Sequence, residues 1–489
     1  MTGTVQAGGR SRGLALAVLC AATLMVILDG TIVTVALPSI QGGLRFSPPD
    51  LTWVMNAYMI AFGSLLLFAG RLGDLIGRKR MFIAGLAVFT AASLACGLSS
   101  APNMLIAARF AQGAGGAMVS AVSLGMIVTL YSEPAERARA IAAFSFVGAA
   151  GASIGLVIGG VLTEALSWHW IFFVNLPIGL LAGLPAVRVL EPDLGIGLRA
   201  GADGLGAFLV TAGLMLTVYA TVQTSRYGWG SAYTLGFAFT AVGLLAAFTV
   251  RQATAATPLL PLRIFSARNV LGANLVQLMV IAAAFGFQVL ITLYGQRVLG
   301  YGPAGSGMAL LPTAVVIGTV SLGFSARLSS RFGERAVLVT GLTMIVVALA
   351  LLTRSPAHGS YVAHLLPALL LFGAGGGLTL PALATLAMSG ATPSDAGLAS
   401  GLFNTTQQVG GALGVAVLST LSAARTTHMR AVGLTTPSAL TSGYDLAFGV
   451  AACLGVAAIV VALTVLRPHG TLSSSNMRSI LADRGRARR

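Results

Sequence analysis

The chain consists of long apolar runs separated by short polar stretches. Each run is close to the ~20 residues that a helix needs to cross the hydrocarbon core of a bilayer. The pattern predicts an all-α integral membrane protein with fourteen membrane-spanning helices. We place these helices at 14–36, 52–70, 81–99, 104–130, 139–161, 168–188, 204–223, 233–251, 270–293, 306–325, 336–354, 362–388, 399–423 and 444–466.

Two parts of this pattern resemble each other. The polar loop Gly70–Lys79, after the second predicted helix, matches Ala326–Arg335 after the tenth, and the glycine-rich stretch 113–116 matches 373–376. Predicted helices 1–6 and 9–14 therefore correspond in order and orientation, while helices 7 and 8 have no counterpart. Parallel repeats of this kind are typical of transporters. We expect two pseudo-symmetric six-helix halves, 14–188 and 268–466, with an inserted helix pair at 204–251.

The basic residues indicate the orientation. Most of them fall in one set of alternate loops and in the terminal segments 1–13 and 467–489. The opposite loops hold only Arg45, Arg226, Arg297, Arg354, Arg425 and Arg430. Because cytoplasmic loops carry the excess of Lys and Arg, both termini are expected in the cytoplasm and the protein in the cytoplasmic (inner) membrane.

Composition excludes a soluble protein. Hydrophobic residues make up 56% of the chain and charged residues only 9%, against about 25% charged in soluble domains. The net charge of +16 could suggest nucleic acid, but the positions of the basic residues already account for it, so no nucleic-acid partner is expected. The lipid bilayer is the expected surrounding, and a monomer the expected state.

Ligand-binding and energy-coupling motifs are sparse. Cys20, Cys96 and Cys453 lie far apart in apolar runs, so neither a metal site nor a disulfide is expected. The chain has no G-x-x-x-x-G-K-[ST] loop for ATP. We therefore expect no cofactor, and energy from an ion gradient or a partner. A proton gradient is sufficient, since one elementary charge crossing 100 mV yields about 2.3 kcal/mol.

Several motifs resemble a known family. GRLGDLIGRK (70–79) is similar to the G-x-L-x-D-x-x-G-R-K signature of the major facilitator superfamily. LDGTIVTVALP (28–38) resembles the helix 1 motif of its fourteen-helix drug:proton antiporter branch, the EmrB/QacA type. Further similar stretches are WHWIFFVNLPIG (168–179), PLLPLRIF (258–265) and AGLASGLFNTTQQVGGALG (396–414). The resemblance spans essentially the full chain. It implies proton-coupled efflux of hydrophobic or amphipathic drugs or antibiotics, and no enzyme activity.

The antiporter motif of predicted helix 5 departs from the family at one position. Gly151, Gly155, Gly159 and Gly160 match its glycines, whereas Leu156 stands where proline is usual. Glycines at four-residue spacing give a smooth face for close helix packing. The local distortion that a proline would cause is absent from the pattern.

Two charged residues lie inside predicted helices and away from the helix ends. The resemblance ties Asp29 in helix 1 and Arg109 in helix 4 to proton coupling. An ionisable residue inside a membrane is costly and is therefore usually functional. The alternatives are a packing or capping role for Asp29, and a structural ion pair or an interfacial charge for Arg109.

The loop after helix 2 is a second candidate. Its residues Gly70, Asp74, Gly77, Arg78 and Lys79 are expected to latch the two halves at their cytoplasmic ends and to release them as the halves rock. A simple orientation signal is the alternative.

Polar and aromatic side chains within the predicted helices are candidates for a substrate cavity, with helix–helix hydrogen bonding as the alternative. They are Trp53, Asn56, Tyr58, Gln277, Gln288, Asn404, Gln407 and Gln408. The tenth predicted helix has no acidic residue, which favours neutral or singly charged amphipathic substrates. A dedicated exporter of one self-made metabolite, or another transporter on the same fold, is the alternative function.

Overall fold

The computed structural model describes residues 3–466 apart from 132, 192, 194, 196, 198–200, 357–359 and 389–395, so the predicted tail 467–489 lies outside the described residues. Every regular element in the described part is a helix. Thirteen helices there are long and apolar enough to cross a membrane. The remaining predicted span lies in α5 (Pro134–Ala165), whose described apolar run is Ile154–Ala165. The predicted all-α membrane fold is confirmed.

The helices follow the predicted order. The N-terminal half contains α1 (Gly3–Leu44), η1 (Asp50–Thr52), α2 (Trp53–Ile76), α3 (Arg78–Gly97), α4 (Pro102–Leu130), α5, α6 (Trp170–Phe173) and α7 (Asn175–Val189). The inserted pair is α8 (Gly204–Tyr227) and α9 (Ala232–Thr254). The C-terminal half contains η3 (Leu262–Ser266), α10 (Arg268–Arg297), α11 (Pro303–Val320), η4 (Ser321–Ser325), α12 (Ala326–Phe332), α13 (Glu334–Leu352), η5 (Tyr361–Leu365), α14 (Leu366–Met388), α15 (Ala396–Ala431) and α16 (Thr436–Thr464).

The two halves repeat the same helix packing. In the first half α1 packs on α5 and α7, α3 on α4 and α7, and α2 on α4. In the second half α10 packs on α15 and α16, α13 on α14 and α16, and α11 on α14. The halves meet through α5 with α11 and α2 with α15, which again correspond. The predicted six-helix halves are therefore present as a structural repeat.

The matched glycine-rich stretches explain part of this repeat. A Cβ atom on Gly113 of α4 would lie 2.3 Å from the Tyr58 carbonyl oxygen, and one on Gly373 of α14 would lie 2.8 Å from that of Thr313. Because glycine has no side chain, the backbone of α4 can contact the backbone of α2 directly. The backbone of α14 can contact that of α11 in the same way.

A shared backbone conformation marks the two copies of the polar loop. Gly77 between α2 and α3 has φ +100°, and Gly333 between α12 and α13 has φ +85°. Only glycine adopts these angles without strain. The repeated sequence therefore encodes the same reversal of the chain in each half.

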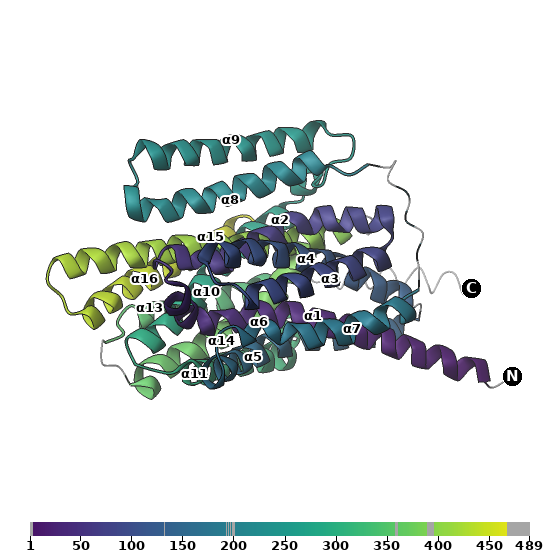
Figure 1. The fold of residues 1–489 in the computed structure, drawn as a ribbon, viewed down its shortest axis with the longest axis horizontal. Helices are drawn as coiled ribbons and strands as arrows, with labels where there is room; N and C mark the ends of the chain where they lie inside the picture. Colours follow the sequence, from purple (N-terminus) through teal and green to yellow (C-terminus); the bar gives the residue numbers. More distant parts are fainter. Residues whose placement is uncertain are drawn as a thin grey trace, which may run out of the picture.

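The inserted pair lies along one flank of the bundle (Figure 1). Helix α8 packs on α2 and α15, one helix from each half, while α9 packs on α8. The carboxylate of Asp203 joins the two inserted helices by accepting hydrogen bonds from Arg251 (3.1 Å) and Gln252 (2.9 Å). The pair is thus a hairpin that is attached to the bundle by one of its two helices.

Several helix bounds differ from the prediction. Helix α1 reaches Leu44 and α15 reaches Ala431, well beyond the predicted 36 and 423. The predicted helix 168–188 is two helices with a break at Val174. Hydropathy marks only the apolar part of a helix, and polar turns such as the last ones of α15, with His428 and Arg430, continue it past that limit.

The bundle has two distinct ends. We call the end with Asp74–Lys79 the motif end, and the end with the α15–α16 turn the hairpin end (Figure 1). At the hairpin end the halves are bonded together: Gln296 donates to the Val35 carbonyl (2.9 Å), and the Glu164 carboxylate accepts from the Ala304 N–H (2.9 Å). Arg297 also donates to the Gln41 side chain. These bonds close the hairpin end.

Candidate functional site

A fully buried ion pair joins α1 to α4. A terminal guanidinium nitrogen of Arg109 lies 2.5 Å from a carboxylate oxygen of Asp29, and both side chains are inaccessible to solvent. The sequence singled out both residues separately, and the fold brings them together. Buried charges persist only when they are paired and their remaining hydrogen-bonding groups are satisfied.

Three polar side chains complete the bonding of this pair. Gln112, one turn after Arg109 on α4, accepts from Arg109 (2.7 Å) and donates to Asp29 (2.7 Å). Asn175, the first residue of α7, also donates to Asp29 (2.9 Å). Ser93 of α3 accepts from the Gln112 amide (2.8 Å). The Asp29 carboxylate thus receives hydrogen bonds from Arg109, Gln112 and Asn175.

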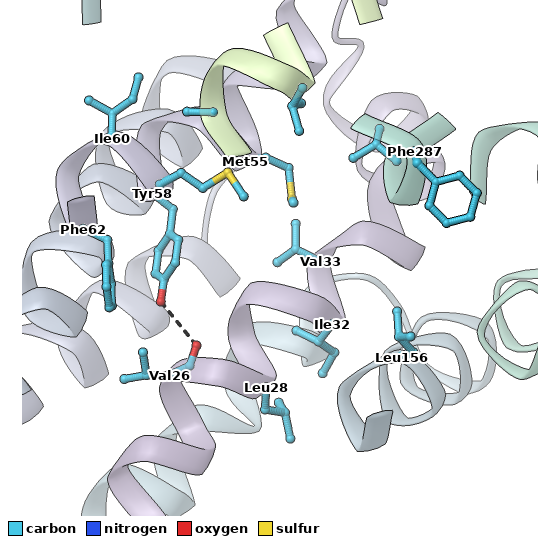
Figure 2. Close-up of a cluster of buried hydrophobic side chains, with 14 of the residues drawn as sticks. Val26, Leu28, Ile32, Val33, Met55, Tyr58, Ile60, Phe62, Leu156 and Phe287 are labelled. Atoms are coloured by element: carbon cyan, nitrogen blue, oxygen red, sulfur yellow. Dashed lines mark hydrogen bonds between the residues drawn. The ribbon is translucent and has the colours of Figure 1, made fainter. Parts of the chain in front are cut away.

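The other groups of Arg109 are held by α2. Its Nε donates to the Val54 carbonyl (2.9 Å), and the guanidinium carbon lies 4.3 Å from the centre of the Tyr58 ring. The Tyr58 hydroxyl in turn donates to the Val26 carbonyl of α1 (3.3 Å), as Figure 2 shows. A cation over an aromatic face is stabilised electrostatically. Residues of α1, α2, α3, α4 and α7 therefore converge on one charge pair.

The ion pair ties the packing of two helices together. A buried charge without its counter-charge is strongly unfavourable. A shift of α1 relative to α4 that separated Asp29 from Arg109 would therefore be costly.

Sequence reasoning missed Gln112, Ser93 and Asn175. Gln112 had a readable signal, because it follows Arg109 by three residues and so shares its helix face. Asn175 lies inside the family-like stretch 168–179. Ser93 had no such signal, since serine is common at helix–helix contacts within membranes.

A cavity of about 2290 Å³ lies between the two halves. Helices α1, α2, α4 and α5 line one side, and α10, α11, α14 and α15 the other. It extends from Asp74 and Arg78 at the motif end to Met55. Arg109 lines the cavity, whereas Asp29 lies behind it and is not a lining residue.

The two walls differ in chemistry. The N-terminal half contributes aromatic and thioether side chains, namely Met55, Tyr58, Met59 and Phe62. The C-terminal half contributes carboxamides together with aromatic rings, namely Gln288, Asn404, Gln407, Gln408, Phe285, Phe287 and Phe372. Largely apolar pockets with a few polar groups are typical of small-molecule sites.

Three predicted cavity residues lie elsewhere. Trp53 packs beside Tyr219 of α8, with ring centres 6.4 Å apart, and Asn56 and Gln277 are buried away from the cavity lining. A polar side chain between two helices and one facing a cavity have the same sequence signature, which explains the difference. Thr313 and Thr379 were not predicted, yet both line the cavity with hydroxyls that lack a partner among the described residues.

The predicted latch residues lie together at the motif end. Asp74 pairs with Arg78 (3.3 Å) across the α2–α3 turn at Gly77, and Lys79 donates to the Val187 carbonyl (2.7 Å). Gly70 lies one turn before Asp74 and lines the cavity. Both bonds stay within the N-terminal half.

The linker after α7 binds this turn. The Asp193 carboxylate accepts from the backbone N–H groups of Arg78 (2.7 Å) and Lys79 (3.2 Å), the first residues of α3. Its partial burial disfavours the charged form. The backbone hydrogen bonds and the charge of Arg78 outweigh burial and hold the pKa of Asp193 below its ordinary value. A carboxylate at a helix N-terminus is a favourable cap.

The α5 glycines face two neighbours. Cβ atoms on Gly151, Gly155 and Gly159 would meet α1, at 2.9 Å from Leu24, 2.1 Å from the Thr31 hydroxyl and 2.7 Å from the Ile32 carbonyl oxygen. One on Gly160 would lie 2.6 Å from the Pro303 carbonyl oxygen at the start of α11. Leu156 itself lines the cavity. Helix α5 therefore packs closely both on the helix that carries Asp29 and on the opposite half.

The chain is similar to proteins of known families over most of its length. The model of the Major Facilitator Superfamily matches residues 19–415. The chain belongs to this superfamily. This major facilitator protein is 38% identical over 456 residues to the cephamycin export protein CmcT of Amycolatopsis lactamdurans, covering 93% of this chain and 91% of that one. It is also 38% identical to the puromycin resistance protein pur8 of Streptomyces alboniger, over 91% of this chain and 89% of that protein.

Solved structures share the fold of this major facilitator protein. A bacterial homologue of the lysosomal transporter Spinster, in an inward-facing and unoccupied conformation, matches with a TM-score of 0.66 at 16% identity, over 93% of this chain and 98% of that one. An auto-inhibited peptide transporter of the POT family matches with a TM-score of 0.67, also at 16% identity, over 94% and 98%. The protein is thus a multi-pass membrane protein with a transporter fold.

Proposed function

We propose that the protein exports small hydrophobic or amphipathic molecules, drugs or antibiotics among them, across the cytoplasmic membrane in exchange for protons. The cavity between the halves is the observation that carries this proposal, because its volume and its apolar walls suit such substrates. The names of the two relatives, which refer to antibiotic export and resistance, support the direction of transport.

The motif end is the cytoplasmic end in this proposal. Both termini then lie in the cytoplasm, in agreement with the distribution of basic residues. The cavity reaches Asp74 and Arg78 at the motif end, and the halves are bonded together at the hairpin end. This conformation therefore receives substrate from the cytoplasm, as a monomer and with no cofactor other than the proton gradient.

Asp29 is the proposed proton-binding group and Arg109 its counter-charge. One proton that enters across 100 mV releases about 2.3 kcal/mol, enough to drive substrate uphill. The Asp29–Arg109 pair borders the cavity through Arg109, so substrate and proton act on the same cluster. The residues of the turn Gly70–Lys79 are the proposed cytoplasmic latch, and the glycines of α5 the proposed sliding surface.

The second candidate is a dedicated exporter of one self-made metabolite. The similarity to a cephamycin export protein favours it, as does 35% identity over 422 residues to a probable actinorhodin transporter of Streptomyces coelicolor, covering 84% of this chain and 72% of that protein. Growth of an expressing, pump-deficient host on a panel of unrelated toxic compounds separates the two. Broad resistance supports multidrug export, and protection against a single compound class supports the dedicated exporter.

Proton coupling is tested in proteoliposomes with an imposed pH gradient. Substrate movement should follow the gradient and collapse when the gradient is abolished. Asp29→Asn should abolish gradient-driven transport while the protein remains in the membrane, with a lowered unfolding midpoint because Arg109 loses its counter-charge. Glu136→Gln, which changes an exposed carboxylate on α5, is the matched control and should transport normally. Undiminished, gradient-driven transport by Asp29→Asn would remove Asp29 from the mechanism.

A further inference from the structure

A second cavity, of about 670 Å³, lies at the hairpin end. It is formed by α1, α2 and the residues before it, α8, α10, α15 and α16. Met55 lines both this cavity and the main one, so the two adjoin at that side chain. We call it the outer pocket. Methionine is flexible and adapts to different neighbours.

The charge of the outer pocket is positive. Its lining includes Arg226, Arg297, His428 and Arg430 but no Asp or Glu. Arg226 is neutralised by Asp50 at 2.5 Å. Among the described residues, Arg297 and Arg430 have no carboxylate within ion-pair distance. An arginine without a counter-charge in a concave site attracts anions.

Two residues of the pocket lining carry buried hydroxyls that have no partner among the described residues. The side-chain oxygens of Ser419 and Thr420 on α15 are at least nine-tenths buried and form no hydrogen bond with any described residue. Leaving a buried hydroxyl unpaired costs about 1–3 kcal/mol. Arg297 lines the same pocket and donates to the Gln41 side chain, so the donors that remain for a bound acceptor are its other N–H groups and these two hydroxyls.

The rest of the lining is apolar. Leu290 and Leu293 of α10, Leu440 of α16 and Trp229 after α8 supply a hydrophobic surface beside the polar groups. The site therefore suits a molecule with two parts, an anionic group and an apolar body.

We infer that the outer pocket binds the anionic group of an amphipathic organic acid, with Arg297 as its counter-charge and Ser419 and Thr420 as hydroxyl donors. The inference extends the proposed export function: the pocket would hold an acidic substrate after it passes Met55 and before release. It places a binding site for the substrate's charged group outside the main cavity, in a pocket whose lining has arginine side chains and no Asp or Glu.

Direct binding to the full chain in lipid nanodiscs tests this assignment separately from transport. The probes are 1-naphthaleneacetate, the neutral 1-naphthaleneacetamide and the cationic 1-naphthylmethylammonium, each corrected with empty nanodiscs. The acetate should bind saturably and at least tenfold more tightly than the other two. Arg297→Gln should weaken acetate binding tenfold or more, and the Ser419→Ala/Thr420→Ala double variant three- to tenfold.

Arg425→Gln is the matched control. Arg425 lies on the same helix and donates to Ser442 (3.2 Å), but it does not line the pocket, so acetate affinity should stay within twofold of the parent protein. Equal affinity for the three probes, or full affinity in both the Arg297 and the α15 hydroxyl variants, overturns the assignment. Loss of acetate binding in Gln407→Leu with no loss in Arg297→Gln also overturns it, because the probe then sits in the main cavity. If the pocket binds the acetate but no substrate is exported, the proposed function fails while the site stands.

Discussion

At the scale of single residues, the central finding is how completely the Asp29 carboxylate is bonded. Its partners come from α4 and α7, and Arg109 is itself bonded to α2. The sequence identified Asp29 and Arg109 because a charge inside an apolar run is conspicuous. It did not identify Asn175 and Ser93, because an uncharged polar residue has many possible neighbours until the helices are packed.

Replacement of Gln112 by leucine should be more damaging than an equivalent change on the cavity wall. Gln112→Leu removes a hydrogen bond to each member of the ion pair, so both buried charges keep fewer hydrogen bonds. The free energy of unfolding should fall by about 1–3 kcal/mol. The thermal unfolding midpoint of the detergent-solubilised protein should fall by several degrees. Gln407→Leu, on the cavity wall, should shift it much less. Equal shifts would mean that the network does not stabilise the fold.

At the scale of helices, backbone-close contacts at glycine decide the packing. Gly159 on α5 and Gly414 on α15 each lie against the first long helix of their half: a Cβ atom would lie 2.7 Å from the Ile32 carbonyl oxygen of α1 in the first case and 2.1 Å from the Ala282 carbonyl oxygen of α10 in the second. The sequence predicted a smooth glycine face on α5. It could not show which neighbour that face meets, since periodicity describes one helix and not its partner.

Alanine at either glycine should therefore weaken the fold. Gly159→Ala and Gly414→Ala each force a methyl group against a fixed carbonyl, and overpacking of this kind costs about 1–3 kcal/mol. Gly243→Ala on α9 is the matched control, because a Cβ atom there meets no atom within 4 Å. We expect lower unfolding midpoints for the first two variants and an unchanged or raised midpoint for the third. A normal midpoint for both packed glycines would contradict the close α1–α5 and α10–α15 contacts.

The cap on α3 should be sensitive to acid. The pKa of Asp193 is lowered in the folded protein, so its contact with Arg78 and Lys79 contributes stability above the ordinary aspartate pKa of about 3.9 and loses it as the pH falls through the lower folded value. Hydrogen exchange of the first α3 amides should be slow at pH 7 and, corrected for intrinsic rates, faster below about pH 4. Asp193→Ala should exchange quickly at both pH values. The same protection in the variant at pH 7 would rule out the cap.

At the scale of the whole molecule, two six-helix halves enclose a cavity that reaches the motif end. Repeats in the sequence predicted the halves and the inserted pair, because loops and glycine stretches recur in register. The sequence could not predict that the hairpin end is closed. That depends on contacts such as Glu164 with Ala304, which join residues of different halves and have no local signature.

Locking the hairpin end should stop transport. In a background of Cys20→Ser and Cys453→Ser, the Glu164→Cys/Ala304→Cys pair joined by a short methanethiosulfonate cross-linker should hold the cavity open to the motif end. Substrate should still bind, but transport in proteoliposomes should be lost and should return when a reductant cleaves the link. Each single cysteine variant treated with the same reagent is the control. Full transport by the cross-linked protein would show that the halves do not separate at this point.

The halves meet along two seams, one between α2 and α15 and the other between α5 and α11, and the position of α8 covers only the first. Helix α8 lies over α2 and α15, and α9 lies outside α8, so one seam is covered by two layers of helix (Figure 1). Over the other seam, between α5 and α11, no described helix outside the two halves is packed. On one flank, the inserted helices α8 and α9 therefore separate the contact between the halves from the lipid. On the other flank, only the contact between α5 and α11 does so. A path from the lipid to the cavity that avoids the inserted pair would have to cross the contact between α5 and α11.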